Sequence, residues 1–211
     1  MFRTSCAAGF RGTANLAGFA RNRHGADALW PFMYIEALNR HLAVCSFDGA
    51  VRLTNSDKGY WNVVSICGPR QLRADLRLAK RTHFACFDDV EDGCSPVYRQ
   101  AKASDIADIF AFIETLVSGP ANPPLLFHCQ QGISRSAAVA LSWIYGQMPR
   151  TDGCFKRSID IILKLRPEAR PNRLVLTLGL AQFMATDEAT RLANRMLADP
   201  RFAPNRFETL K

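Results

Sequence analysis

The order of the elements that the sequence predicts indicates an α/β fold, a single domain whose central, mostly parallel sheet of four to five strands is flanked by helices. Three observations lead to this expectation. Short apolar runs typical of buried strands occur early in the chain, helix-period patterns lie between them, and only helical patterns follow the last strand. The length of 211 residues suits one such domain with extensions and is short for two full cores.

Composition and charge narrow the class of protein. The hydrophobic content of 48% and the charged content of 22% are ordinary for a globular protein. The formal net charge of +8 favours anionic partners. We find no zinc-ligand spacing, basic zipper or RNA-binding sheet motif, so no nucleic-acid partner is expected. No apolar run approaches the roughly 18 residues of a membrane span, and no secretory signal with a long apolar core is found.

The cysteines indicate the compartment. Seven occur, which is an odd number, no CxxC pair is found, and several lie inside apolar runs. Reduced thiols in a reducing compartment explain this pattern better than a disulfide framework or a zinc site. We therefore expect a cytoplasmic protein, and the sequence does not indicate its oligomeric state.

The two ends of the chain differ from its middle. Residues 1–31 are rich in arginine and carry no acidic residue before Asp27, so we interpret them as a disordered extension, with an organelle transit peptide as the alternative. Residues 32–200 form the predicted domain. Residues 201–211 form a tail that we expect to fray.

The first elements of the domain are predicted to be strands, followed by one basic segment. Three strands are expected over residues 42–47, 61–67 and 84–87. A short helix is expected over residues 71–80, because Leu72, Leu76 and Ala79 recur there at helical spacing among several arginine and lysine residues. We interpret its basic face as solvated surface, and a docking patch for acidic partners is the alternative.

Helices dominate the rest of the chain. Ser104 is the expected N-cap of an apolar-faced helix that Gly119-Pro120 ends. An apolar strand then runs from Leu125 to Cys129 and leads into a helix over residues 136–145. The expected helices after it are one capped by Asp152, one capped by Asn172 and one over residues 188–198.

The stretch between that last strand and its helix carries the chemistry. Cys129 stands at the end of the strand and Arg135 follows six residues later at the start of the helix. The backbone N–H groups between them can point into one small bowl, where unpaired amides and the helix dipole both favour negative charge. Such a bowl stabilises a thiolate, which makes Cys129 a nucleophile near neutral pH, and it can also hold a phosphate against the sulfur.

The motif His-Cys-x5-Arg followed by serine resembles the active-site signature of the cysteine-dependent protein tyrosine and dual-specificity phosphatases. Its form is most similar to the dual-specificity branch, and in full it reads His128-Cys129-x-x-Gly132-Ile133-Ser134-Arg135-Ser136. The similarity extends from about residue 33 to residue 183. Over this range the chain resembles small bacterial tyrosine-phosphatase-like proteins. It includes the segments Phe87-x-Asp89-Val90 and Glu168-Ala169-Arg170-Pro171-Asn172. The resemblance implies a dual-specificity phosphatase-like fold and makes residues 32–200 a phosphatase domain.

The residues of the motif make chemical sense one by one. Arg135 offers a bidentate fork to two phosphoryl oxygens, and Gly132 turns its amide inward without a Cβ in the way. Ser136 can donate a hydrogen bond to the sulfur, and His128 is expected to orient the loop rather than act as a base. The predicted phosphate-binding set is Gln130, Gln131, Gly132, Ile133, Ser134 and Arg135. Gln131 departs from the family pattern, which has a small residue there, most often alanine.

A general acid is also needed, because an aryl or alkyl oxide leaves poorly without a proton. The family supplies it as an aspartate from a loop before the cysteine, and Asp88, Asp89 and Asp92 compete for this role. We select Asp89, because Phe-x-Asp-Val matches the pattern of the similar bacterial proteins. Asp88 is the alternative, and its other possible role is to cap the strand end.

Together these residues predict a metal-independent phosphomonoester hydrolase that acts through a cysteinyl-phosphate and needs no cofactor. The loop side chains at positions 130, 131, 133 and 134 are neutral, which favours a singly phosphorylated protein substrate. Phosphotyrosine is favoured, and dual specificity for phosphoserine or phosphothreonine stays open. The alternatives are a phosphate-binding pseudophosphatase and a phosphatase that acts on phosphoinositides or another non-protein phosphate. Whether Cys67 or Cys86 can trap oxidised Cys129 as a disulfide depends on distances that the sequence does not contain.

Overall fold

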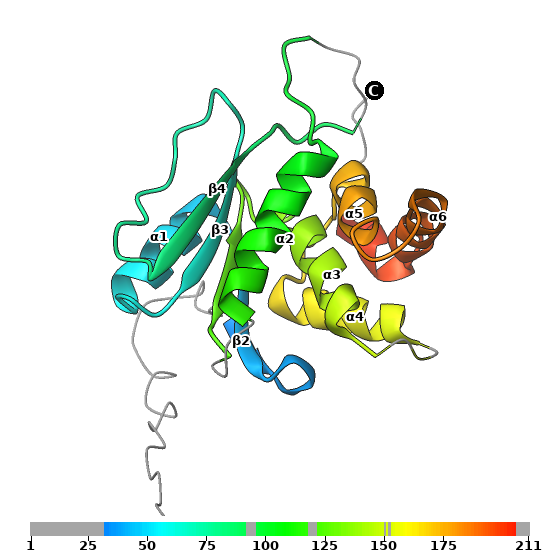
Figure 1. Cartoon of the computed structure of the whole chain (residues 1–211), viewed down its shortest axis with the longest axis horizontal. Coiled ribbons are helices and arrows are strands. Elements are labelled where there is room, and N and C mark those ends of the chain that lie inside the picture. The colour runs from blue at the N-terminus through cyan, green and yellow to red at the C-terminus, as the bar shows by residue number, and fades with distance from the viewer. Residues whose placement is uncertain (1–31, 92–95, 118–121, 150, 152, 206–211) are drawn as a thin grey trace, which may run out of the picture. The chain divides into compact units, whose positions relative to one another are not determined.

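The computed structural model describes residues 32–91, 96–117, 122–149, 151 and 153–205, with side chains as far as Phe202 (Figure 1). These residues belong to one compact unit, Pro31–Lys211. The expected disorder of residues 1–31, the expected cap Asp152 and the candidate acid Asp92 lie outside the described residues.

The described residues form five strands and six α-helices. The strands are β1 (Phe32–Ile35), β2 (Arg40–Cys45), β3 (Asn62–Cys67), β4 (Arg81–Cys86) and β5 (Leu125–His128). The helices are α1 (Phe47–Ser56), α2 (Ala103–Val117), α3 (Arg135–Gln147), α4 (Cys154–Leu165), α5 (Arg173–Leu180) and α6 (Thr186–Leu197). Two short 3-10 helices are η2 (Glu36–Leu38) and η3 (Pro200–Asn205).

The sheet has the strand order β1-β2-β5-β3-β4, in which β1 is antiparallel to β2 and the other neighbours are parallel. The predicted α/β class with a mostly parallel sheet is therefore confirmed. Parallel strands need a crossover between them, and this places helices on the two faces of the sheet. Strand β5 lies between β2 and β3, so the loop that follows it leaves from the middle of the sheet.

Alternate side chains of the central strands pack into two separate cores, as the two-residue period of a strand requires. Val64 and Phe127 face the larger core, which the helices α2 to α6 cover. Val63 and Leu126 face the smaller core under α1. Figure 1 shows the same arrangement, with α1 on one side of the strands and α2 to α6 on the other. Because both faces are covered, β3 and β5 are buried along their whole length.

The helix expected over residues 71–80 is absent, and this prediction was wrong. The segment is a loop in which Ala74 and Leu76, two residues apart, are buried, while Leu72 is 85% exposed. Ala74 and Leu76 both belong to the smaller core, and two residues two positions apart share a face in an extended chain but not in a helix. A turn after Gly68 begins the loop, where the Gln71 N–H donates to the Gly68 carbonyl at 3.0 Å.

Two further elements differ from the expectation at their ends. Phe47, expected as the last residue of a strand, is the first residue of α1, because the Ser46 hydroxyl accepts a hydrogen bond from Gly49 N at 3.2 Å and caps that helix. Ser104 is not a cap, since α2 begins one residue earlier at Ala103. The expected cap Asn172 is confirmed, because its side chain accepts from the backbone of α5.

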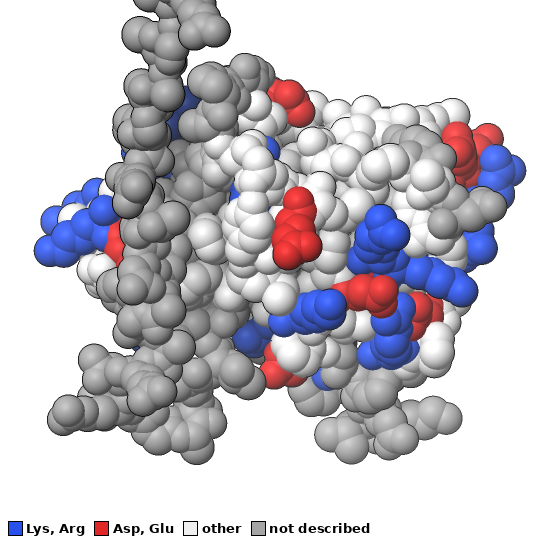
Figure 2. Space-filling view, turned by 90° about the horizontal axis from the view of Figure 1, so that it is seen from below, with Lys and Arg blue, Asp and Glu red and all other residues white. Residues whose placement is uncertain are grey.

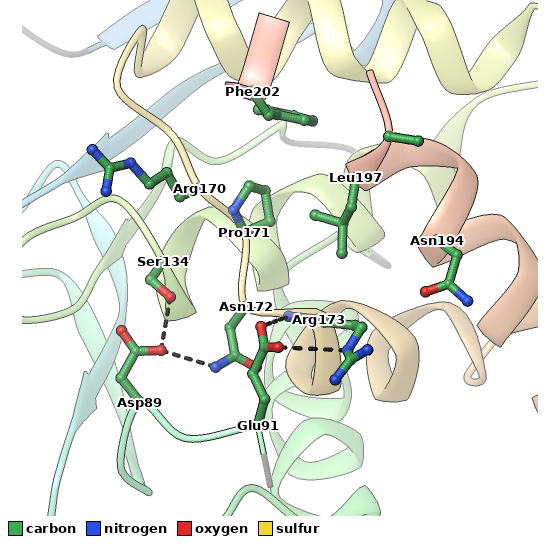
Figure 3. A pocket seen from close by; sticks show the side chains of 11 residues that line it. Asp89, Glu91, Ser134, Arg170, Pro171, Asn172, Arg173, Asn194, Leu197 and Phe202 are labelled. Atoms are coloured by element: carbon green, nitrogen blue, oxygen red, sulfur yellow. Dashed lines mark hydrogen bonds and ion pairs between the residues drawn. The ribbon is translucent and has the colours of Figure 1, made fainter. Parts of the chain in front are cut away.

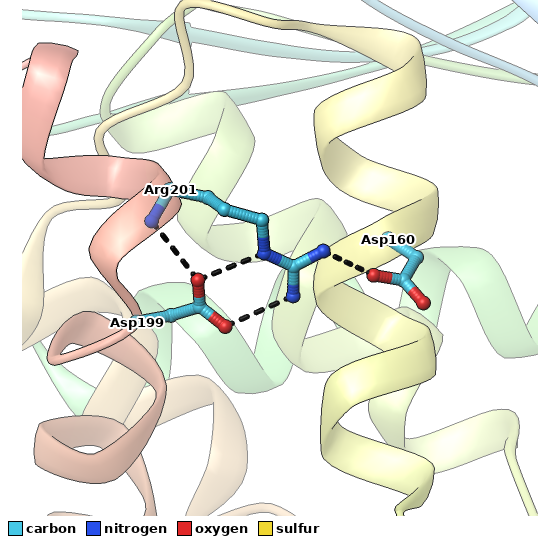
Figure 4. Close-up of polar contacts among 3 residues, drawn as sticks. All are labelled: Asp160, Asp199 and Arg201. Carbon is cyan, nitrogen blue, oxygen red and sulfur yellow. Dashed lines mark hydrogen bonds and ion pairs between the residues drawn. The ribbon is translucent and has the colours of Figure 1, made fainter.

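The expected fraying does not begin at residue 201. Phe202 is buried, and Arg201 forms ion pairs with Asp199 and with Asp160 of α4 (Figure 4). The Arg201 Nε–Asp199 Oδ1 distance is 2.8 Å. Residues 200–205 are therefore ordered as the 3-10 helix η3, which continues the domain past α6.

The surface adds two observations. On the face that Figure 2 shows, basic side chains are interspersed with acidic ones over part of the surface and do not form one continuous basic patch there. None of the helices within the described ranges is long and apolar enough to cross a membrane.

Candidate active site

The loop of residues 129–134 connects the carboxyl end of β5 to the N-terminus of α3. In open α/β sheets this edge is where ligands bind. Neighbouring segments hold the loop through its carbonyl groups, while the Gly132 N–H turns inward to the Cys129 sulfur. Phe47 N donates to Gln130 O at 3.2 Å, and Arg170 N donates to Ile133 O at 2.6 Å. Arg166 Nη2 donates to Gln131 O at 3.3 Å.

Cys129 lies at the bottom of this loop and is 2% exposed. Its Sγ accepts a hydrogen bond from Gly132 N at 3.3 Å and another from Ser136 Oγ at 3.2 Å. Hydrogen bonds to the charged form of a group stabilise that form, and the N-terminus of α3 acts in the same direction. The described cysteines are all free thiols, and Cys67 lies opposite Cys86 in the register of β3 and β4.

Arg135 is the first residue of α3 and is 3% exposed. Its Nη1 donates to Phe87 O at 2.8 Å, and its Nη2 contacts Gln71 Oε1 at 3.3 Å. Gln71 Oε1 also accepts from Gly68 N at 2.7 Å. These contacts orient the guanidinium beside the loop before any anion binds. Sequence reasoning missed Gln71, because it falls in the segment that was expected to be helical.

His128 is buried at the end of β5, and its Nδ1 lies 3.4 Å from Cys129 O. Burial first, and then the nearby positive charge of Arg135, lower the pKa of His128 to about 4. The imidazole is therefore neutral at neutral pH. A neutral, buried imidazole that contacts the loop backbone suits an orienting role.

Asp88 and Asp89 are adjacent in sequence but point to different surroundings. Asp89 Oδ1 accepts from Ser134 Oγ at 2.7 Å and from Asn172 Nδ2 at 2.9 Å (Figure 3). The Asp88 carboxylate instead accepts from Arg99 N at 2.8 Å, and Asp88 N donates to Arg99 O at 2.7 Å. Asp88 thus joins two stretches of its own loop, whereas Asp89 faces the loop that holds the cysteine.

A small cavity of about 240 Å³ collects the predicted groups. Its lining residues are Gln71, Asp89, Cys129, Gln130, Gln131, Ile133, Ser134 and Arg135. Gln130 and Gln131 are exposed, so the side chain that departs from the family pattern lies on the solvent side of this cavity. A second hollow of about 750 Å³ shares Asp89 and Ser134 with this cavity and extends toward α5 and α6 (Figure 3). Within the described residues, no three His, Cys, Asp or Glu side chains form a group that could hold a metal ion.

Replacing Gly132 with alanine is expected to disrupt the loop. Gly132 has φ +76°, and a Cβ there would lie 2.2 Å from the backbone of Cys45. Strain and overpacking together are expected to lower the free energy of unfolding by about 2 to 5 kcal/mol. Because the loop must also shift, calorimetric titration should find inorganic phosphate bound at least about tenfold more weakly, a loss of about 1.4 kcal/mol.

The matched control for this change is Gly59→Ala. Gly59 has a similar φ of +69° but no atom within 4 Å of the added Cβ. Its cost is therefore expected to stay at about 1 to 2 kcal/mol, with phosphate binding unchanged. Equal losses for the two variants in chemical denaturation would show that the contact with Cys45 does not matter.

Comparison with known proteins agrees with this geometry at the level of the fold. No family model matches the chain. A protein of Dictyostelium discoideum described as a probable dual specificity protein phosphatase is 33% identical over 64 residues, which are 30% of this chain. The match spans about a quarter of that relative, 26% of its length.

Two solved structures are similar over most of the chain. One is a mouse protein assigned as a dual specificity phosphatase and crystallised with zinc tungstate. It is 21% identical, with 81% of this chain and 96% of that chain covered and a TM-score of 0.50. The other is human DUSP28, which is 15% identical, with 78% and 98% covered and a TM-score of 0.50.

The sheet order, the loop between β5 and α3 and these likenesses show that the chain has the fold of the dual-specificity phosphatases, as its motif predicts. At these identities the solved structures establish the fold. The reaction has to be argued from the site itself.

Proposed function

We propose that the chain is a phosphoric monoester hydrolase, most specifically a protein tyrosine phosphatase, with Cys129 as nucleophile and Asp89 as general acid. One observation carries the proposal. The sulfur of Cys129, the guanidinium of Arg135 and the carboxylate of Asp89 line the same small cavity. A nucleophile, an anion clamp and a proton donor around one cavity are the groups that hydrolysis of a phosphate ester needs.

In the first step the Cys129 thiolate attacks phosphorus in line with the ester oxygen. The new P–S bond forms as the P–O bond to the leaving group breaks, and the proton of Asp89 moves to the leaving oxygen. Arg135 and the N–H groups of residues 130–135 hold the three remaining phosphoryl oxygens. Because the Arg135 side chain is already oriented by Phe87 and Gln71, it needs little reorganisation as charge develops.

In the second step a water molecule attacks phosphorus and the P–S bond breaks. Asp89, now ionised, takes a proton from that water, and inorganic phosphate leaves. The departing sulfur becomes a thiolate again. The hydrogen bonds from Ser136 Oγ and Gly132 N stabilise this charge, which makes the thiolate a better leaving group.

The proposed substrate is a protein carrying a single phosphate, with phosphotyrosine preferred and dual specificity possible within the same mechanism. The side chains of the loop itself at Gln130, Gln131, Ile133 and Ser134 are neutral, so the loop offers no extra cation for a second phosphate group. The Dictyostelium relative is described as a probable dual specificity protein phosphatase, which supports a protein substrate. A phosphoinositide phosphatase and a pseudophosphatase that binds phosphate without turnover are the competing functions.

Turnover measured in EDTA with three classes of substrate tests this function. The panel contains a phosphotyrosyl peptide, the matched phosphoseryl peptide and a set of phosphoinositides. We expect the largest kcat/KM for the phosphotyrosyl peptide, at least about tenfold above the others, which corresponds to about 1.4 kcal/mol of transition-state discrimination. Preference for an inositide would reassign the substrate, and phosphate binding without turnover of any ester would make the protein a pseudophosphatase.

A further inference from the structure

The proposed acid Asp89 is hydrogen-bonded to the N-cap residue of helix α5. Asn172, the N-cap of that helix, forms hydrogen bonds in two directions. Its Oδ1 accepts from Val175 N at 3.0 Å, and its Nδ2 donates to Asp89 Oδ1 at 2.9 Å. The amide cannot flip without losing both hydrogen bonds, so the helix cap determines which group faces Asp89.

A second residue of the loop that carries Asp89 also contacts this end of α5, and we call residues 88–91 the acid loop. Glu91 Oε1 accepts from Arg173 N at 2.7 Å, and Glu91 Oε2 lies 3.5 Å from Arg173 Nε. Figure 3 shows Asp89 and Glu91 side by side, both directed at the start of α5. A carboxylate at the first turn of a helix is stabilised by its free N–H groups and by its dipole.

Helix α5 is a rigid anchor for this loop. Val175 and Leu176 are fully buried in the larger core. Gly179 packs so closely on α3 that a Cβ there would lie 2.1 Å from Ser142 Oγ. Because α3 also begins with Arg135, the acid loop and the loop of residues 129–134 are connected through the packing of α5 on α3.

We propose that Asn172 and Glu91 are positioning residues for the general acid, holding the acid loop on α5 so that Asp89 stays within reach of the leaving oxygen. This inference rests on the proposed function. Asp89 Oδ1 already accepts from Ser134 and Asn172, so Oδ2 is the oxygen that carries the proton to the leaving group. Without the contacts of Asn172 and Glu91 the acid loop would not be held on α5, and Asp89 Oδ2 could move away from the cavity. Proton transfer depends steeply on such distances.

Substrates with leaving groups of different basicity distinguish positioning of the acid from a structural role. A phenol with a pKa of about 10, like tyrosine, needs protonation, whereas a more acidic phenol such as p-nitrophenol needs it much less. Asn172→Ser keeps an N-cap but removes the amide donor. We expect its kcat on phenyl phosphate to fall about tenfold or more and its kcat on p-nitrophenyl phosphate to change much less.

Substitutions of Glu91 test the same positioning role independently, because one variant removes the contact with Arg173 and another keeps it. Glu91→Ala is expected to show the same selective loss, while Glu91→Gln, whose side-chain oxygen can still accept from Arg173 N, restores most of the rate on phenyl phosphate. Glu188→Gln is the control, because Glu188 is also in the first turn of a helix, α6, but lines a different hollow from Asp89 and Glu91.

The outcomes separate this inference from the function on which it rests. Equal losses on both esters in Asn172→Ser and Glu91→Ala, or no loss on either, would overturn the positioning role while the wild-type turnover still supports a phosphatase. Wild-type protein without any turnover would overturn both. If Asn172→Ser fails to fold, the comparison of Glu91→Ala with Glu91→Gln still tests the positioning role.

Discussion

Replacing Cys129 with serine is expected to abolish turnover of a phosphotyrosyl peptide while phosphate binding is kept. A serine hydroxyl can occupy the same buried position and accept the same hydrogen bonds, but it is not ionised near neutral pH and is a far weaker nucleophile. The Arg135 clamp is unchanged. The loss of kcat should reach about 10⁴-fold or more, as for the removal of other catalytic nucleophiles.

Initial rates in EDTA and calorimetric titration with inorganic phosphate measure the two parts of this result. Acid quenching of the wild-type protein during turnover should also trap phosphate on Cys129, which mass spectrometry can locate. Cys154→Ser is the control, since Cys154 is a free thiol on α4 outside the cavity. If the Cys129→Ser protein kept its turnover, another residue would be the nucleophile.

The second large effect is expected for Asp89→Asn. Asparagine has nearly the same shape and its Oδ1 can still accept from Ser134 and Asn172, so the loop stays in place while the proton is lost. General acid catalysis contributes about 10²- to 10⁴-fold, and kcat on phosphotyrosyl peptide should fall within that range.

Asp88→Asn is the matched comparison for this substitution. Its side-chain oxygen can still accept from Arg99 N, so the loop is preserved and kcat should stay within about threefold of the wild type. A large loss in Asp88→Asn together with a small loss in Asp89→Asn would reassign the acid to Asp88. Rates of the two variants on one substrate, with chemical denaturation to verify folding, decide between them.

The errors in predicting the elements have local physical causes. Residues 71–80 contain three apolar side chains at helical spacing, those of Leu72, Leu76 and Ala79. Of these three only Leu76 is buried. The segment packs on the smaller core as a loop, and this contact overrode its weak helical pattern. Helix α1 was missed although Ser46 is a typical N-cap, because the strand before it was extended too far, to Phe47.

Within the candidate site, the groups that are close along the chain could be predicted from local sequence. Cys129, Gly132, Arg135 and Ser136 are held within one strand–loop–helix unit, so backbone geometry alone brings them around one point. The same holds for the cap Asn172, which acts on a residue three positions later. Such short-range geometry can be predicted because few chain conformations are compatible with it.

The distant side chains that line the same cavity are known only from the tertiary packing. Asp88 and Asp89 were distinguished in the sequence by the resemblance alone, and in the structure they differ because one faces Arg99 and the other faces Ser134 and Asn172. The contact of Arg135 with Gln71 spans 64 positions. The direction of a side chain at a strand end follows from where the next segments pack, and that packing depends on the whole core.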